Sequence, residues 1–361
     1  MKILYGVVGE GMGHATRSKV ILSHLVAGHD VQVAVSGRAH GFLSKSFPTL
    51  PVHEIHGLTM VYEDNRVMKS KTAYEFLRGL SHTGENVEKM EQIWEQFQPD
   101  LCIADFESFA YLFAKEHRLP VLSIDNMQII NRCRHDIQIP DEEANSFRLA
   151  KAFVKAKLPR CDHYFITTFF FPEVRKKRTS LHPPILRQTI LDAKASATPA
   201  DRAEHVLVYQ TSDTFTDLIP TLHSLPHRFL VYGYKRDEVL GNVHLKDFSE
   251  SGFVDDLKTS KAVLAGGGFS LMGEAVYLGK PMYSVPLKGQ FEQTLNALYL
   301  KKLGYGEYHQ DLSRESISAF LARTGEYAKA LAEYRQDGNQ DILAAIDGKI
   351  EEVKEKGSLL G

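Results

Sequence analysis

Short apolar runs alternate with amphipathic segments along most of the 361-residue chain. The first apolar run covers 2–8, a helical pattern covers 16–27, and a second apolar run covers 31–35. Strand, helix and strand in this order are typical of a βαβ unit with parallel strands. Further runs that we interpret as strands lie at 100–104, 121–124 and 163–168 in the first half, and at 205–209, 229–232, 262–265 and 282–285 in the second.

One stretch without periodicity separates the two halves. Residues 175–201 mix prolines with polar residues, so we expect the linker there. Alternating strands and helices on both sides predict an α/β fold of two doubly wound Rossmann-like domains that face each other across a cleft. The boundaries that we predict are 1–180 for the N-terminal domain, 181–203 for the linker, 204–325 for the C-terminal domain, and 326–361 for a helical tail that packs back towards the first domain.

The composition narrows the class of protein. A hydrophobic fraction of 43% and a net charge of -2 are typical of a soluble globular chain and give no reason to expect nucleic acid as a partner. Cys102, Cys133 and Cys161 are odd in number and far apart, so they predict neither a disulfide framework nor a zinc site. The first apolar run is too short for a signal peptide, and no run reaches the roughly 18–20 residues of a membrane-spanning helix. We therefore expect a cytoplasmic protein.

A glycine-rich junction in the second half carries the clearest candidate chemistry. The strand at 262–265 is followed by three glycines and by a helix over 272–278 that Ser270 could cap. The N–H groups of such a turn and the positive end of the helix dipole suit a phosphate or diphosphate. Glu274 has no basic residue one turn away, so a local ion pair explains it poorly. The alternative is a plain connection between strand and helix. The junction residues are Gly266, Gly267, Gly268, Phe269 and Ser270.

A second glycine-rich turn follows the first strand and leads to His14. It is not a dinucleotide fingerprint, because His14 stands where the third glycine would be, and it lacks the Gly-Lys-Ser/Thr of a P-loop. A histidine at the cleft edge of the sheet, approachable because of its glycines, is a candidate general base. Arg17, one turn later, could face an anion. The alternative is a capping or packed histidine.

Polar residues also follow three other predicted strands. Asp105 and Asp125 end strands at the edge where such sheets bind ligands. Asp105 is the candidate for orienting His14 or contacting an acceptor, with a helix N-cap as the alternative, and the N-cap is favoured for Asp125. Thr211 and Ser212 could contact a phosphate or form a simple turn. The candidates for contact with an acceptor or a phosphate are Gly11, Gly13, Arg17 and Glu107.

Residues 148–178 form a basic segment with bulky apolar residues. It contains nine Lys or Arg residues but only Asp162 and Glu173 as acids. Such a patch could hold a protein to anionic lipid, at about 1 kcal/mol per basic residue near the surface. A solvated helix and linker is the favoured interpretation. His53 and His56 lack a third ligand at useful spacing, so no metal site is predicted.

Together these motifs resemble the two-domain nucleotide-sugar glycosyltransferases with the GT-B architecture. The resemblance is strongest to the family 28-like branch that contains the undecaprenyl-pyrophosphoryl-muramoyl N-acetylglucosaminyltransferases. Many relatives have a Ser or Thr three residues before the glutamate, a position held here by Leu271. The matching residues are Gly266–Gly268, Glu274-Ala275, Gly279-Lys280-Pro281, Pro286 and Glu292–Ala297 in the second half, and Gly11–His14 in the first.

The resemblance implies inverting, metal-independent transfer of a sugar from a UDP-sugar to a hydroxyl acceptor, which could be lipid-linked or a cell-envelope glycan precursor. It implies that the backbone of Val254, next to Phe253, pairs with uracil and that Glu274 holds the ribose. The backbone of 267–270 would carry the diphosphate. Glu292 and Gln293 would contact the transferred sugar, and His14 would act as base or contact the acceptor.

Two rival functions share this interpretation of the fold. Some nucleotide-sugar hydrolases have a Gly-His-x-x-Arg loop, which His14 and Arg17 also match. A non-catalytic nucleotide-sugar-binding subunit is the second rival. No cofactor is expected besides the UDP-sugar co-substrate, and no Asp-x-Asp sequence predicts a bound metal. Contact with an anionic membrane at its inner face stays an additional possibility.

Overall fold

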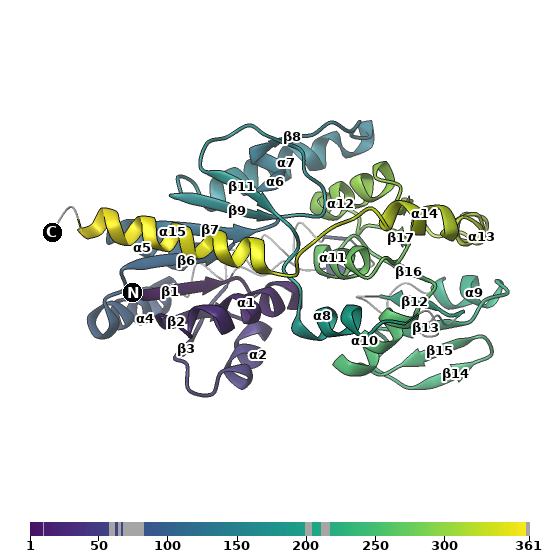
Figure 1. Ribbon diagram of the computed structural model, residues 1–361, viewed down its shortest axis with the longest axis horizontal. Coiled ribbons are helices and arrows are strands. Elements are labelled where there is room, and N and C mark those ends of the chain that lie inside the picture. Colours follow the sequence, from purple (N-terminus) through teal and green to yellow (C-terminus); the bar gives the residue numbers. More distant parts are fainter. Residues whose placement is uncertain are drawn as a thin grey trace.

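The computed structural model describes residues 1–9, 11–57, 62–63, 66–67, 83–198, 204–210 and 217–358. Two α/β domains lie side by side, each built on a seven-stranded sheet (Figure 1). The predicted pair of doubly wound domains is confirmed.

The N-terminal sheet has the strand order β11-β9-β7-β6-β1-β2-β3, and its strands pair in parallel. The direction of winding changes between β1 and β6, which leaves a crevice above their carboxyl ends, where such folds bind ligands. The strands are β1 (Lys2–Val7), β2 (Asp30–Ser36), β3 (Val52–Ile55), β6 (Leu101–Asp105), β7 (Val121–Asp125), β9 (His163–Thr167) and β11 (Thr179–His182). The helices are α1 (Met12–Leu25), α2 (Arg38–Ser46), α4 (Thr83–Phe97), α5 (Ser108–Glu116), α6 (Ile129–Arg132) and α7 (Ala144–Lys157).

The C-terminal sheet repeats this plan with the order β14-β15-β13-β12-β16-β17-β18, in which only β14 pairs in an antiparallel manner. Its crevice lies between β12 and β16. The strands are β12 (Val206–Tyr209), β13 (Phe229–Tyr232), β14 (Glu238–Leu240), β15 (Val243–Lys246), β16 (Ala262–Ala265), β17 (Met282–Ser284) and β18 (Gly306–Tyr308). The helices are α9 (Leu218–His223), α10 (Glu250–Thr259), α11 (Phe269–Tyr277), α12 (Phe291–Lys302), α13 (Arg314–Ala322) and α14 (Thr324–Leu331).

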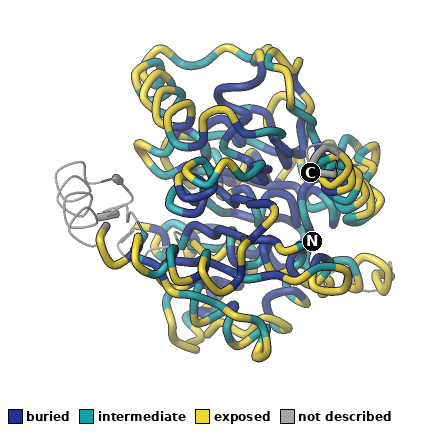
Figure 2. Tube along the Cα trace, turned by 90° about the vertical axis from the view of Figure 1, so that its left-hand side faces the viewer, coloured by how far each residue is buried: buried dark blue, intermediate teal, exposed yellow. Residues whose placement is uncertain are grey.

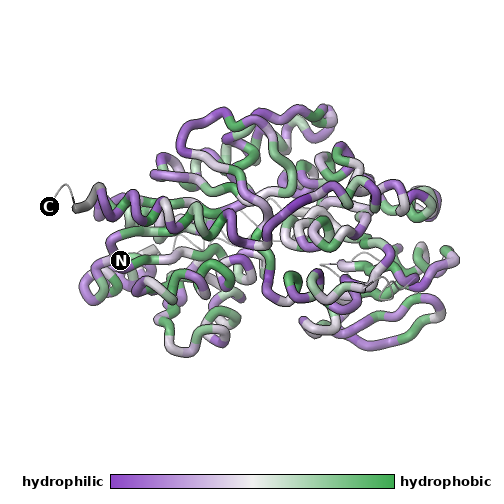
Figure 3. The backbone as a smooth tube through the Cα atoms, viewed as in Figure 1, coloured by the Kyte–Doolittle hydropathy of each residue, from purple (hydrophilic) through white to green (hydrophobic). Residues whose placement is uncertain are grey.

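Burial explains why the strands read as nearly continuous apolar runs. Every residue of β6 and of β7 is buried, because helices cover both faces of a parallel sheet. Figure 2 shows this arrangement, with buried strands inside and exposed helix faces outside. The same strands are mostly hydrophobic along their length in Figure 3.

The chain crosses between the domains twice. Strand β11 reaches His182, two residues beyond the predicted end of the N-terminal domain, and the linker then forms α8 (Gln188–Ala195), which packs against α10. The last helix, α15 (Gln340–Ser358), returns along the N-terminal domain (Figure 1). Its Ile342, Ile346 and Ile350 share one helix face and join the apolar core under β1 and β2.

Aromatic contacts join the two domains. The ring centroids of Phe147 on α7 and Phe291 on α12 lie 5.0 Å apart. Phe170 stacks on Tyr299 of α12 with centroids 3.9 Å apart and the ring planes 9° from parallel. These contacts hold both ends of α12 against the N-terminal domain.

Candidate active site

His14 and Asp105 meet at the crevice of the N-terminal sheet. His14 lies in the first turn of α1, and Asp105 ends β6 opposite Val7 of β1. The two side chains are joined at 2.7 Å between His14 Nδ1 and Asp105 Oδ1. The carboxylate is fully buried, whereas 19% of the His14 side chain is exposed. The structure therefore brings together the residue expected to act as base and the residue expected to orient it.

Arg17 and Ser18 surround the other edge of the Asp105 carboxylate. Arg17 Nε donates to Oδ2 at 2.9 Å, and the Ser18 hydroxyl donates to the same oxygen at 3.0 Å. Burial alone would raise the pKa of Asp105, but the charges of Arg17 and His14 and their hydrogen bonds lower it to about 2. Asp105 is therefore ionised at neutral pH. Arg17, expected to face an anion, is buried and faces this carboxylate.

The ionised carboxylate of Asp105 determines which tautomer of His14 is stabilised. A hydrogen on Nδ1 of His14 is stabilised by donation to Asp105, so Nε2 carries the lone pair. Arg17 Nη2 also lies 2.8 Å from Nδ1, but it has Asp105 Oδ1 as its acceptor. An imidazole held in this way can accept a proton at Nε2.

A chain of hydrogen bonds runs from this pair to the C-terminal domain. Arg17 Nη1 donates to Asn126 Oδ1 at 3.2 Å, and Asn126 Nδ2 donates to Glu292 Oε1 at 2.7 Å. Asn296 Nδ2 donates to the same Glu292 oxygen at 2.6 Å and to the carbonyl of Gly267 at 3.0 Å. Asn126 was missed in the sequence, because its role depends on α12 lying across the cleft.

The glycine-rich junction starts a helix, as expected, but its details differ. Helix α11 begins at Phe269 with Gly268 at the N-cap position, so Ser270 lies inside the first turn and does not cap it. The first N–H groups of a helix have no partner within it, which here leaves those of 268–271 for a ligand. Gly13 packs closely on this turn, because an added Cβ would lie 2.5 Å from Ser270 Oγ and the Ser270 side chain would have to move.

The Gln293 side chain is hydrogen-bonded to the backbone of the glycine-rich junction. Its Oε1 accepts from the N–H of Gly267 and of Leu287, each at 3.1 Å, and its Nε2 donates to Gln290. A Cβ on Gly267 would lie 2.4 Å from the Gln293 carbonyl oxygen, which explains this glycine. The expected sugar contact of Gln293 is therefore corrected to a supporting role, and the Gly267 N–H is already paired.

Glu274 has an ion-pair partner that local spacing could not reveal. Arg187, directly before α8, donates from Nε and Nη2 to the two Glu274 oxygens, each at 2.8 Å. Its Nη1 donates to Glu250 at 3.2 Å. No local partner was expected for Glu274, and the partner that it has lies 87 residues away, in the linker. Each carboxylate oxygen keeps a second lone pair for another donor.

The segment expected to hold the base is helical. Phe253 and Val254 are buried inside α10, where the backbone groups of Val254 serve the helix. Pairing of uracil with the Val254 backbone is therefore corrected. Phe248, which precedes α10 at the carboxyl end of β15, is 58% exposed and offers a ring for stacking. The sequence offered one signal for Phe248, an aromatic residue between a strand and a helix.

The remaining candidates are mostly structural. Glu107 caps α5, with its carboxylate accepting from the N–H of Phe109 at 3.0 Å and of Ala110 at 2.6 Å, so its expected contact with an acceptor is corrected. Asp125 accepts from the Gln128 N–H at 2.7 Å, but Gln128 itself is the N-cap of α6, so the favoured capping role of Asp125 is wrong. Gly11, with φ 83°, occupies the N-cap of α1. The predicted phosphate contacts Thr211 and Ser212 lie outside the described residues.

Two absences concern the part of the chain that the structure describes. Within it, no three or more His, Cys, Asp or Glu side chains gather in a way that could hold a metal ion. None of the described helices is long and apolar enough to cross a membrane. Cys102, Cys133 and Cys161 are buried free thiols.

Two doubly wound domains with polar groups from both in contact are typical of the GT-B architecture. The family model described as Glycosyl transferase family 1 matches residues 1–325, and the chain belongs to this family. A relative from Methanosarcina acetivorans, named as an uncharacterized glycosyltransferase, is 26% identical over 330 residues that cover 85% of each chain. A protein of Methanosarcina mazei with the same name is 23% identical over 332 residues, again 85% of each chain.

Solved structures share the fold at low sequence identity. CalG4, the calicheamicin glycosyltransferase, is similar with a TM-score of 0.65 and 15% identity, covering 98% of both chains. UGT2 of Phytolacca americana, complexed with UDP-2fluoro-glucose and pterostilbene, is similar with a TM-score of 0.63 and 14% identity, covering 96% of this chain and 99% of that one. The predicted GT-B architecture and glycosyltransferase class are confirmed.

Proposed function

We propose that this glycosyltransferase moves a sugar from a UDP-sugar to a hydroxyl acceptor with inversion, without a metal ion. The observation that supports this most is the His14–Asp105 pair at 2.7 Å, with the imidazole partly exposed and the carboxylate buried. A base held in this way suits direct displacement at a sugar carbon.

In the proposed reaction, His14 Nε2 takes the proton of the acceptor hydroxyl as its oxygen attacks the anomeric carbon. The bond from that carbon to the diphosphate oxygen breaks on the opposite face, and UDP leaves with the electron pair. Asp105 stabilises the imidazolium that forms. One direct displacement inverts the anomeric centre.

The donor is proposed to lie on the glycine-rich junction. The N–H groups at 268–271 and the dipole of α11 would stabilise the charge that develops on the departing diphosphate. Glu274 would accept hydrogen bonds from ribose hydroxyls through lone pairs that Arg187 does not use. Glu292, between Asn126 and Asn296, would contact the transferred sugar. UDP as the nucleotide gains support from the UDP-2fluoro-glucose in the UGT2 structure.

The acceptor is proposed to be a hydroxyl compound of the family 28-like kind, lipid-linked or a cell-envelope glycan precursor. This rests on the sequence resemblance and on the basic segment at 148–178, which could rest on an anionic membrane at its inner face. Exposed Leu149 and Phe153 on α7 lie beside basic residues, as such contact requires.

The test is UDP release from a panel of UDP-sugars, each with and without a panel of hydroxyl acceptors. Release that needs an acceptor and falls at least about 100-fold in H14A supports the transferase. Equal release without acceptor supports the hydrolase, and nucleotide binding without any release supports the binding subunit. The anomeric configuration of the product, determined by NMR, tests inversion directly.

A further inference from the structure

Part of the basic segment lines a pocket that contains neither the His14–Asp105 pair nor the glycine-rich junction. The pocket has a volume of about 370 Å³ and lies between α7 and the chain that follows β10 (Glu173–Val174). The residues that line it are Asn131, Arg148, Lys151, Ala152, Lys155, Arg175 and Lys176. Five of these seven side chains are cationic and none is acidic.

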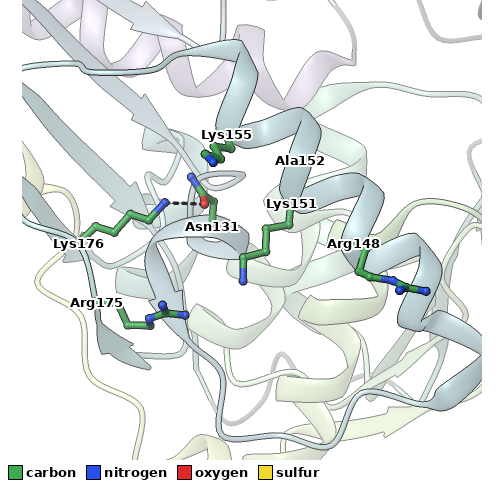
Figure 4. Close-up of a pocket in the computed structure, with 7 residues that line it drawn as sticks. All are labelled: Asn131, Arg148, Lys151, Ala152, Lys155, Arg175 and Lys176. Atoms are coloured by element: carbon green, nitrogen blue, oxygen red, sulfur yellow. Dashed lines mark hydrogen bonds between the residues drawn. The ribbon is translucent and has the colours of Figure 1, made fainter.

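The α7 wall follows from helix periodicity. Arg148, Lys151, Ala152 and Lys155 are spaced by three or four residues, so they share one face, and Ala152 leaves room between the longer side chains. Figure 4 shows Lys151 pointing into the space between this helix and the opposite chain, whereas the Arg148 side chain points away from that space.

The opposite wall is fixed by the backbone. Val174 of β10 pairs with Cys133 of β8 (Cys133–Arg134), and the N–H of Arg175 donates to the carbonyl of Arg132 at 2.9 Å. Lys176 Nζ donates to Oδ1 of the buried Asn131 at 2.7 Å, which Figure 4 also shows. The cations on this side are thus held at the pocket by the fold.

The residues that line the pocket include no acid that could balance its positive charges. Burial, followed by the charges of Arg132, Lys155, Lys151 and Arg175, lowers the pKa of Lys176. Glu173, the acid nearest in sequence to Arg175 and Lys176, pairs at 3.3 Å with Arg134, which does not line the pocket. Cations kept together against their repulsion would be stabilised by an anion.

We propose that this pocket binds a phosphate group, either of a soluble phosphate compound or of a lipid headgroup. A compact anion with several charges matches the Lys and Arg donors that line this small space, although Arg148 at its edge donates to Asn145. An extended polyanion would instead need basic residues in a long row across the surface. None of the lining residues belongs to the His14–Asp105 pair or the glycine-rich junction, so the pocket can be tested independently of the proposed transferase reaction.

Isothermal titration with inorganic pyrophosphate at constant pH and ionic strength tests the site, with UDP present in excess so that the glycine-rich junction is occupied. The double variant K151E/K155E alters the α7 wall. K45E/K329E is the control, since it changes the net charge equally at two exposed lysines on α2 and α14, away from the pocket. K151E/K155E should bind at least about tenfold more weakly, or about 1.4 kcal/mol, and the control within about twofold of wild type. Circular dichroism melting establishes that both variants fold.

Co-sedimentation with phosphatidylcholine vesicles, with and without phosphatidic acid, separates the two sources of phosphate. Loss of binding to the phosphatidic acid vesicles only in K151E/K155E assigns a lipid headgroup. Loss of pyrophosphate binding without vesicle binding assigns a soluble compound. Both outcomes support the site. Absence of any loss specific to K151E/K155E in both assays overturns the proposal.

Discussion

Asn126 of the N-terminal domain donates through Nδ2 to Oε1 of Glu292 in the C-terminal domain over 2.7 Å. Its Oδ1 accepts from Arg17, which holds Asp105. One amide therefore connects the candidate catalytic pair to the helix that supports the donor junction. Because an amide both donates and accepts, it satisfies a cation on one side and a carboxyl on the other.

The variant N126D tests whether this bond keeps the domains together. It keeps an oxygen for Arg17 but turns a carboxylate towards Glu292, so like charges repel when both are ionised. Above pH 7 we expect a larger radius of gyration than in wild type, measured by small-angle X-ray scattering. At pH 5, where Glu292 is protonated, the difference should vanish. Equal radii at pH 8 would show that the bond does not control domain separation.

Burial raises the pKa of Glu292 to about 7, although hydrogen bonds from Asn296 and Asn126 oppose the shift. Unfolded, the group ionises near 4.5. Because the folded protein holds this proton more tightly, its contribution to stability is present below pH 4.5 and is lost as the pH rises to 7.

The variant E292Q keeps the acceptor oxygen but cannot ionise. Relative to wild type it should therefore gain about 1–3 kcal/mol in unfolding free energy between pH 4.5 and pH 8, with the residual exposure of Glu292 limiting the gain. Urea denaturation at several pH values measures this difference. A difference that does not change with pH would contradict the raised pKa.

Much of this architecture was predictable from sequence. Apolar runs such as 121–124 mark strands because parallel strands are buried on both faces, and His14 and Asp105 follow strands that the doubly wound order makes neighbours. Contacts between distant segments were not predictable. Arg187 reaches Glu274 because α8 of the linker packs on the C-terminal domain, and Gln293 reaches Gly267 because α12 packs beside α11. Local spacing carries no signal for either.

The variant D105N tests the role of the buried carboxylate. It removes the charge that stabilises the imidazolium and replaces one of the two acceptor oxygens by an N–H donor that can favour the wrong His14 tautomer, so kcat should fall by about 10²–10⁴ while the KM for donor changes little. S18A is the matched control, because it removes one hydrogen bond to Asp105 and leaves the charge. Its kcat should stay within about tenfold of wild type. A kcat of D105N similar to that of S18A, on protein shown to be folded, would exclude the proposed role.

The Arg187–Glu274 pair should stabilise the packing of the linker on α11. R187A leaves a buried carboxylate without its partner, whereas R187A/E274A removes both charges. Urea unfolding of wild type, R187A, E274A and R187A/E274A should give a coupling free energy of about 1–3 kcal/mol between the two side chains. Additive losses would mean that the pair contributes no stability of its own.

The central claim, that the glycine-rich junction and Glu274 hold the nucleotide of the donor, is tested most directly by calorimetric titration of UDP into wild type, E274A and E250A. Glu250 is the matched control, since it also accepts from Arg187 but is exposed. We predict that E274A weakens UDP binding by at least about tenfold, or 1.4 kcal/mol, and that E250A stays within about twofold of wild type. Equal affinities in wild type and E274A, or no binding of UDP by the wild type, would contradict the claim.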